Sequence, residues 1–192
     1  MTKKYELVLD DTISFWGWKL FRIRALISFG SVEVGDLGRY IEKEENLSHD
    51  GNAWVYGDAK VYGDAEVYGN AEVYGNAEVY GNAKVSGDAK VWGDAWVYGD
   101  AEVYGNAKVW GNAKVSGNAE VSELGDIIVF KNHWSSGRHF TYTKSNKMWK
   151  VGCFYGTGQE LIEKAYRDSE KSGNYYKAYV DFVETLERLS EE

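Results

Sequence analysis

The alternation of small apolar and polar residues in the middle of the chain is the most regular pattern in the sequence. From Gly51 to Ser122 a six-residue unit, Gly-(Asn/Asp)-Ala-x-Val-(Tyr/Ser/Trp), repeats twelve times without a break. Ala and Val are two positions apart, so both side chains point to the same face of an extended strand. Gly followed by Asn or Asp allows the positive φ angles that a tight corner requires. Each unit therefore predicts a short strand followed by a corner.

Two architectures could use this unit. A flat meander would use Gly-Asn as a hairpin turn, but it would leave the Ala and Val face of its sheet uncovered. Three units rolled into a triangular coil of 18 residues would enclose these side chains and pair each strand with the coils above and below. Because burial favours the coil, we expect residues 51–122 to form four stacked coils of 18 residues.

Residues 18 positions apart should stack on the outside of such coils. The charges fit this period, because Glu72 would neighbour Lys90, Lys84 would lie between Glu66 and Glu102, and no two Asp would be adjacent in a corner column. The position after Val gives three columns: Tyr56, Tyr74, Trp92 and Trp110; Tyr62, Tyr80, Tyr98 and Ser116; and Tyr68, Ser86, Tyr104 and Ser122.

The aromatic columns have two interpretations. Stacked rings can reinforce the coils as a ladder, or they can form the surface of an oligomer or of a partner complex, where Tyr and Trp are favoured. The first column contains no Ser and is the most apolar. It is our candidate interface, made of Tyr56, Tyr74, Trp92 and Trp110, and we expect a homo-oligomer.

The segments on either side of the repeat should cap the two ends of the solenoid, which otherwise expose strand edges. Residues 1–50 are the predicted N-terminal cap, rich in β structure, with a strand at Lys19–Leu26 and glycine turns between Phe29 and Tyr40. Arg22 and Arg24 would share one face of that strand, either as solvated charges or as an anion site.

Residues 123–192 are the predicted C-terminal α/β cap. Ile127–Phe130, His139–Thr143 and Met148–Phe154 read as strands, and Thr157-x-x-Glu160 is a capping box that begins a helix reaching about Lys171. A second helix is expected after Gly173, where apolar residues recur at helical spacing. The glycines at 156 and 158 are better explained by this N-cap than by a phosphate loop.

Composition and charge argue against several classes of function. The net charge is -8 with no basic segment, so binding to a nucleic-acid polymer is not expected. Cys153 is the one cysteine, which excludes an intrachain disulfide and suits a reducing cytosol. The first eleven residues lack the apolar core of a secretion signal, and no apolar run is long enough to span a membrane.

The repeat resembles the hexapeptide-repeat, left-handed parallel β-helix family, in which Ala53-x-Val55 through Ala119-x-Val121 would match the inward positions. That resemblance implies the left-handed coil. Many of its members are acyltransferases with a histidine base, and others hold zinc with coil histidines. The repeat here contains neither His nor Cys. We therefore expect no catalysis, metal or cofactor, although His133, His139 and Cys153 could meet in the C-terminal cap.

A closer resemblance covers nearly the whole chain. Lys19-Leu-Phe-Arg-Ile-Arg-Ala-Leu26, Gly35-Asp-Leu-Gly38 and Asn46-Leu-Ser-His49 before the repeat, and Met148-Trp-Lys-Val-Gly-Cys-Phe154 with Gly156-Thr-Gly158 after it, are similar to uncharacterised hexapeptide-repeat proteins of bacteriophages and prophages. The resemblance implies a phage-derived protein in the bacterial cytoplasm. It implies no known activity.

The leading hypothesis is therefore a non-enzymatic protein that binds a host protein or a nucleotide second messenger and thereby inhibits antiviral defence. A structural or assembly scaffold is the first alternative. The second is an acyltransferase-like enzyme that uses a cap histidine at a subunit interface. A nucleotide would suit the stacking rings and cations of the caps, namely Trp16, Trp18, Arg22, Arg24, His133, Trp134, Arg138 and His139.

Overall fold

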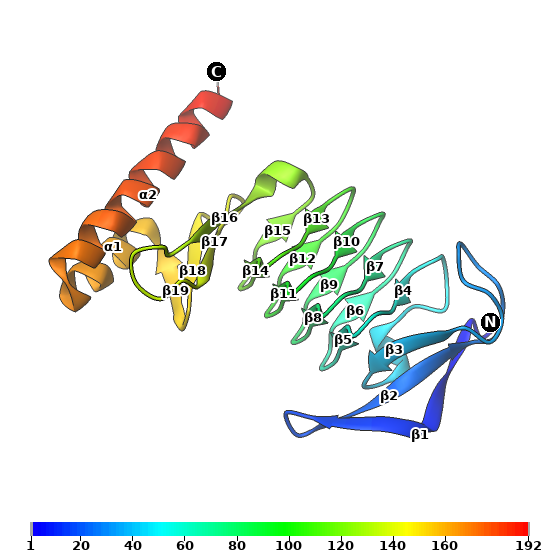
Figure 1. The fold of residues 1–192 in the computed structure, drawn as a ribbon. Coiled ribbons are helices and arrows are strands. Elements are labelled where there is room, and N and C mark those ends of the chain that lie inside the picture. Colours follow the sequence, from blue (N-terminus) through cyan, green and yellow to red (C-terminus); the bar gives the residue numbers. More distant parts are fainter. Residues whose placement is uncertain (1, 192) are drawn as a thin grey trace.

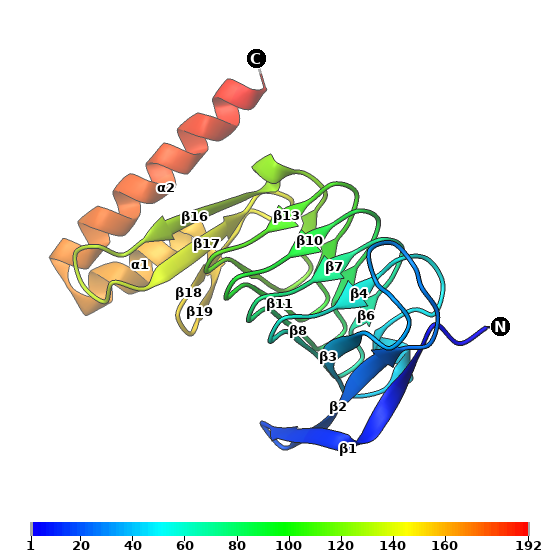
Figure 2. The ribbon, with the colours of Figure 1, turned by 45° about the vertical axis from the view of Figure 1, so that its right-hand side comes forward.

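A parallel β-solenoid of stacked 18-residue coils forms the centre of the protein. The computed structural model describes residues 2–191, with an N-terminal strand region at one end of the solenoid and two C-terminal helices at the other (Figures 1 and 2). Strands one coil apart pair in parallel at the predicted period, for example Val55 with Val73 and Val91 with Val109. The predicted mainly β fold is confirmed.

Each six-residue unit contributes one two-residue strand, and these strands build three walls. The first wall contains β4 (Trp54–Val55), β7 (Glu72–Val73), β10 (Lys90–Val91) and β13 (Lys108–Val109). The second contains β5 (Lys60–Val61), β8 (Glu78–Val79), β11 (Trp96–Val97) and β14 (Lys114–Val115). The third contains β6 (Glu66–Val67), β9 (Lys84–Val85), β12 (Glu102–Val103) and β15 (Glu120–Val121).

The interior of the solenoid is filled by the repeated Ala and Val. Every Ala and Val of the twelve units is buried, and these side chains belong to one continuous apolar cluster. The corner glycines have φ angles between 61° and 72°, and from Gly51 to Gly99 each lies directly against the glycine of the next coil. A side chain at such a corner would therefore be strained and would collide with backbone.

The N-terminal strands extend the second wall. β1 (Tyr5–Phe15) and β2 (Trp18–Ala25) form an antiparallel hairpin, and β2 pairs with β3 (Leu37–Ile41). β3 then pairs in parallel with β5, and Leu47 bridges to Val67, so coil pairing begins before the repeat itself. The strand expected near residues 19–26 is present as β2. Its partner β1 was not expected.

Two buried side chains complete the N-terminal end of the solenoid, where backbone carbonyls have no preceding coil. The Lys4 ammonium donates to the carbonyl of Ala53 at 2.9 Å, and the Asn46 amide donates to the carbonyls of Gly63 and Ala65 at 3.0 and 2.8 Å. Both residues are almost fully buried. They replace the N–H donors that a further coil would supply. A 3-10 turn, η1 (Glu44–Asn46), positions the amide.

The C-terminal unit is a four-stranded antiparallel sheet covered by two helices. After η2 (Leu124–Asp126) come β16 (Ile127–Lys131), β17 (His139–Thr143), β18 (Met148–Val151) and β19 (Phe154–Thr157), followed by α1 (Gly158–Asp168) and α2 (Glu170–Ser190). The capping box between Thr157 and Glu160 is present. No helix within residues 2–191 combines the length and the apolarity needed to cross a membrane.

Two details of this unit differ from the expectation. The single strand expected over 148–154 is two strands, because Gly152 adopts a φ of 55° and turns the chain. The second helix begins at Glu170, before Gly173, with Ser169 as its N-cap. Gly173 lies inside the helix, and a glycine is required at this position because the ring of Tyr166 on α1 occupies the space that a side chain would need.

Hydroxyl groups of this unit cover the other end of the solenoid, where N–H groups lack a following coil. Thr141 Oγ1 accepts from the N–H of Lys114 at 2.9 Å, and Ser145 Oγ accepts from the N–H of Glu120 at 2.8 Å. A parallel stack exposes carbonyls at one end and N–H groups at the other. The two caps accordingly offer donors at the first end and acceptors at the last.

Replacing corner glycines will show how tightly the coils stack. A Cβ at residue 75, where φ is 68°, would lie 2.8 Å from the backbone nitrogen of Gly93, whereas a Cβ at Gly111, where φ is 64°, meets nothing within 4 Å. We expect Gly111→Ala to lower the free energy of unfolding by about 1 kcal/mol through backbone strain, and Gly75→Ala by about 3 kcal/mol or more. Denaturant titration measures both. Equal losses would contradict the close approach.

The buried Lys4 predicts a pH dependence of stability. Burial lowers the pKa of its ammonium to about 8 from 10.5, although Asp50 opposes the shift. Between those pH values the unfolded chain binds more protons than the folded chain, so the free energy of unfolding contributed by this residue rises with pH, by roughly 3 kcal/mol at most. The rise should be absent in Lys4→Met. Parallel pH profiles of the two proteins between pH 7.5 and 10 would show the prediction to be wrong.

Candidate functional site

The turn between β1 and β2 carries an exposed tryptophan in a strained conformation. Trp16 and Gly17 both have positive φ, 50° and 88°, as in a two-residue type I′ turn. Asn or Gly normally occupies the first of these positions, because other side chains cost about 1 kcal/mol in the left-handed region. The Trp16 side chain is 83% exposed, so burial does not compensate. Fold stability therefore does not account for this residue.

The hairpin lies against the second aromatic column of the solenoid. Phe15 meets Tyr62 edge to face with ring centroids 5.8 Å apart, and Trp18 contacts the same ring at 6.1 Å. Leu20, Tyr40 and Tyr62 form a small buried cluster of their own. This packing fixes the hairpin on the wall of β5 and β8, so the position of its tip is defined.

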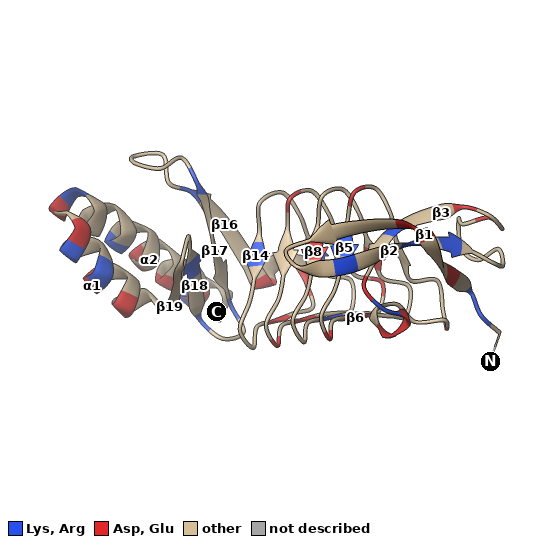
Figure 3. Cartoon of the chain, turned by 90° about the horizontal axis from the view of Figure 1, so that it is seen from below, with Lys and Arg blue, Asp and Glu red and all other residues tan. Residues whose placement is uncertain are grey.

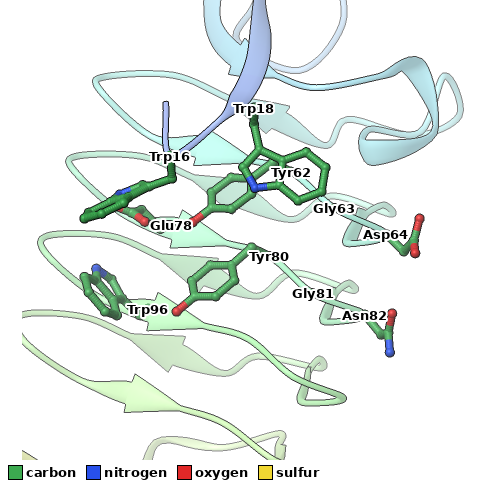
Figure 4. Close-up of a pocket in the computed structure, with 10 residues that line it drawn as sticks. All are labelled: Trp16, Trp18, Tyr62, Gly63, Asp64, Glu78, Tyr80, Gly81, Asn82 and Trp96. Carbon is green, nitrogen blue, oxygen red and sulfur yellow. Dashed lines mark hydrogen bonds between the residues drawn. The ribbon is translucent and has the colours of Figure 1, made fainter. Parts of the chain in front are cut away.

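An open cleft of about 580 Å³ lies between the hairpin tip and the second wall (Figure 4). The side chains of Trp16, Tyr62, Tyr80 and Trp96 surround a common space beside Glu78. Two consecutive coils supply the tyrosines, and a third supplies Trp96. The complete lining is Trp16, Trp18, Tyr62, Gly63, Asp64, Glu78, Tyr80, Gly81, Asn82 and Trp96.

The polar groups of the cleft are acidic or neutral. Asp64 and Glu78 are its charged lining residues, and the lining contains no Lys or Arg. Burial raises the pKa of the Tyr62 and Tyr80 hydroxyls, and the Glu78 carboxylate adds to this effect, so both phenols stay protonated. Tyr62 donates a hydrogen bond to Glu78 at 3.1 Å. The cleft thus joins aromatic faces to negative charge, the combination that favours cations over anions.

The first aromatic column forms the predicted stack. The rings of Tyr56, Tyr74, Trp92 and Trp110 follow one another with centroids 4.8, 5.6 and 5.5 Å apart and interplanar angles of 13° or less. Trp110, at the end of the column, is 43% exposed. The ladder therefore stabilises the coils, and one wide ring is left open to solvent. Its use as an interface stays a prediction.

The four candidate residues of the N-terminal cap have two different surroundings. Trp16 and Trp18 line the cleft. Arg22 instead pairs with Asp11 at 3.3 Å, and Arg24 pairs with Glu6. Each guanidinium is thus already neutralised by a carboxylate of the neighbouring strand β1. An anion bound at these two arginines would have to compete with these carboxylates, and the anion site stays a prediction.

The four candidate residues of the C-terminal cap lie at the opposite end of the solenoid from the hairpin (Figures 1 and 2). Trp134 stacks on Tyr175 with centroids 4.6 Å apart and belongs to the core of the sheet and helices. His133 meets the edge of that pair and lies 3.4 Å from the Tyr179 hydroxyl, while Arg138 is exposed and His139 is part of β17. The two sets of cap residues therefore do not form one site within a chain.

The histidines and the cysteine do not gather into a metal centre within residues 2–191. His49 is mostly buried, stacks on Tyr5 with centroids 4.4 Å apart, and accepts a hydrogen bond at Nδ1 from the N–H of Lys4. No group of three His, Cys, Asp or Glu residues that could hold a metal ion occurs in residues 2–191, so His133, His139 and Cys153 do not make one.

Sequence reasoning missed the solenoid side of the cleft. Tyr80 was placed in a column, but Glu78 and Trp96 were not proposed as site residues. A signal existed in the repeat, because Trp at the position before Val is a large apolar side chain directed outward where Lys or Glu usually stands. What the sequence could not indicate is that the hairpin lies above this position, since β1 was not expected.

Acidic and basic positions are interspersed along the solenoid and helices (Figure 3), in agreement with the absence of a basic segment. A comparison with protein-family models finds no match for the chain, and a search of curated proteins finds none either. The geometry of the cleft is therefore the basis for a functional proposal.

The turn offers a direct test of whether Trp16 serves the fold. We expect Trp16→Asn to keep or raise the free energy of unfolding by up to about 1 kcal/mol, because Asn-Gly is the favoured type I′ sequence. Trp18→Ala should lower it by about 1 kcal/mol through lost packing on Tyr62. Chemical denaturation compares the two variants. A marked loss in Trp16→Asn would make Trp16 a structural residue.

Proposed function

We propose that the protein is a non-enzymatic binding protein and that the aromatic cleft is its recognition surface. The observation that carries the proposal is the strained, 83% exposed Trp16, which lines an open cleft together with Tyr80 and Trp96. Exposed tryptophans and tyrosines gathered around one hollow are typical of binding sites. Strain retained at an exposed position is a further mark of functional surfaces.

The chemistry of the cleft supports binding over catalysis. Its lining contains no His, Cys, Ser or Lys, and of its two carboxylates, Asp64 and Glu78, the latter already accepts a hydrogen bond from Tyr62. His49, just before the repeat, is mostly buried and held by Tyr5 and the Lys4 backbone, which disfavours the acyltransferase-like alternative.

The biological setting of the proposal comes from the resemblance to phage and prophage proteins. On that basis the protein acts in the bacterial cytoplasm during infection and inhibits host antiviral defence by occupying a host component. Of the two targets considered, the cleft favours a host protein over a nucleotide signal. Phosphates would meet Asp64 and Glu78, whereas Arg22 and Arg24 are paired with carboxylates.

A structural or assembly role is the second candidate, with the solenoid as a spacer in a homo-oligomer. The exposed Trp110 at the end of the first ladder favours it, because a wide aromatic ring open to solvent is suited to self-association. Trp110→Ser should then lower the mass measured by light scattering. The two candidates use different faces, so they can be tested separately.

The full-length protein incubated with a bacterial lysate and examined by native mass spectrometry tests the binding proposal. We expect a stable added mass with the wild type, and at least about a tenfold loss of it in Trp16→Asn and in Trp96→Lys. Tyr68→Ser is the matched control, because it removes an exposed ring at a position where the same column has Ser86 and Ser122. Capture that survives both cleft variants would refute the proposal.

A further inference from the structure

The first wall of the solenoid contains a carboxylate in the position that Glu78 has on the second wall, so the surroundings of the two carboxylates can be compared. On the first wall, Glu72 stands between Trp54 and Lys90 in neighbouring coils. The Lys90 ammonium lies 2.9 Å from the Glu72 carboxylate, and the Tyr56 hydroxyl donates to the same carboxylate at 2.7 Å. Burial opposes ionisation, but these two hydrogen bonds lower the pKa of Glu72. A phenol and an ammonium therefore satisfy the carboxylate on this wall.

The second wall repeats this arrangement without its cation. Glu78 accepts from Tyr62 as Glu72 does from Tyr56, but Trp96 stands at the position that corresponds to Lys90. Within residues 2–191, no Lys, Arg or His nitrogen lies within 4.0 Å of the Glu78 carboxylate.

The lysine on the other side of Glu78 is directed elsewhere. Lys60 pairs with Glu78 in the strand register, but its ammonium donates to the carbonyl of Asp58 at 3.1 Å and lies over the ring of Phe15 at 4.7 Å. The Lys60 ammonium therefore does not pair with Glu78. A half-buried carboxylate inside an aromatic cleft is left with a single phenolic donor.

Aromatic rings surround the Glu78 carboxylate. Trp16, Tyr80 and Trp96 face the space beside the carboxylate (Figure 4). Aromatic faces attract ammonium and guanidinium groups, most strongly in the case of tryptophan. Trp96 already accepts one such contact, because the ammonium of Lys114 lies 4.1 Å from its ring centroid. Lys114 does not line the cleft and forms no ion pair with Glu78 within 4.0 Å. Burial lowers the pKa of its ammonium, and the more distant Glu78 carboxylate is one of the charges that oppose this shift.

We propose that the cleft binds a basic side chain, the guanidinium of Arg or the ammonium of Lys, from a segment of a partner protein. Glu78 pairs with the cation, and Trp16, Tyr80 and Trp96 pack on it. The inference rests on the proposed function, since it names the chemistry that the same cleft recognises. The inserted cation takes the place that Lys90 has on the first wall.

The occupant is a protein segment other than a second copy of this chain. The cleft opens to solvent along a rim formed by Trp16 and Trp18, 83% and 41% exposed, which gives contact area beyond one side chain. The chain itself carries a net charge of -8, so a second copy would bring mostly like charge to an acidic cleft. Charge complementarity therefore selects a basic partner.

Titration with blocked peptides, followed by the indole NH signals of the full-length protein in NMR spectra, tests the inference. The probes are a Gly-Arg-Gly peptide, its Lys counterpart, and a Gly-citrulline-Gly peptide that has nearly the shape of the first without its charge. We expect the basic peptides to shift the signals of Trp16 and Trp96 and to bind at least about tenfold more tightly than the citrulline peptide. Added salt should weaken the binding.

Substitutions distinguish the contribution of the Glu78 charge to binding from the contribution of the aromatic rings. Glu78→Gln keeps the acceptor for Tyr62 and should weaken the Arg peptide about tenfold, whereas the matched Glu72→Gln on the first wall should not. Trp96→Lys should abolish binding while the protein stays folded, because it recreates the Glu72–Lys90 pair on the second wall. An unchanged affinity in Glu78→Gln would overturn the inference.

Other outcomes overturn it in distinguishable ways. Equal binding of the citrulline peptide, or tighter binding of a neutral oligosaccharide or of adenosine monophosphate, would show that the cleft does not select a cation. If no basic peptide binds but capture from the lysate still requires Trp16, the cation inference fails and the proposed function stands. If capture is also independent of the cleft, both fail.

Discussion

The hydrogen-bond ladder between successive coils is the interaction on which the rest of this structure depends. Each coil donates backbone N–H groups to carbonyls of the next, as Trp54 does to Ala71 at 3.1 Å and Tyr56 to Val73 at 3.0 Å, and the pattern recurs through the stack. It places residues 18 apart in columns and gives the solenoid one end of carbonyls and one end of N–H groups. The buried Lys4 at the first end and the Thr141 hydroxyl at the last are consequences of that polarity.

The same constraint explains how a functional surface arises on a regular scaffold. The repeat keeps Ala and Val inside the solenoid but leaves one outward position per strand free to vary. The side chain at this position lies between the side chains at the same position in the coils before and after it. Lys90 over Glu72 gives a satisfied pair, whereas Trp96 over Glu78 gives an acidic carboxylate beside a ring. The β1–β2 hairpin brings Trp16 close to Trp96 and Glu78, and the cleft lies between the hairpin and the second wall.

The sequence was sufficient for the parts governed by periodicity. Burial of Ala and Val, the 18-residue period and the ring stack from Tyr56 to Trp110 all follow from the six-residue unit. The cleft joins residues from 16 to 96, and the position of the hairpin depends on tertiary packing of Phe15 and Trp18 against Tyr62. The cap residues chosen as rings and cations could not be placed relative to one another without the fold.

The measurement that tests the central claim most directly is photo-cross-linking in bacterial cells with a benzoyl-phenylalanine residue in place of Trp18, at the rim of the cleft, or, separately, of Trp110. If the cleft is the recognition surface, the protein altered at Trp18 becomes linked to a host protein, and sequencing of the linked peptide by mass spectrometry places the bond beside an Arg or Lys. If only the protein altered at Trp110 cross-links, and only to a second copy of itself, the aromatic ladder is the working surface and the account of the cleft is wrong.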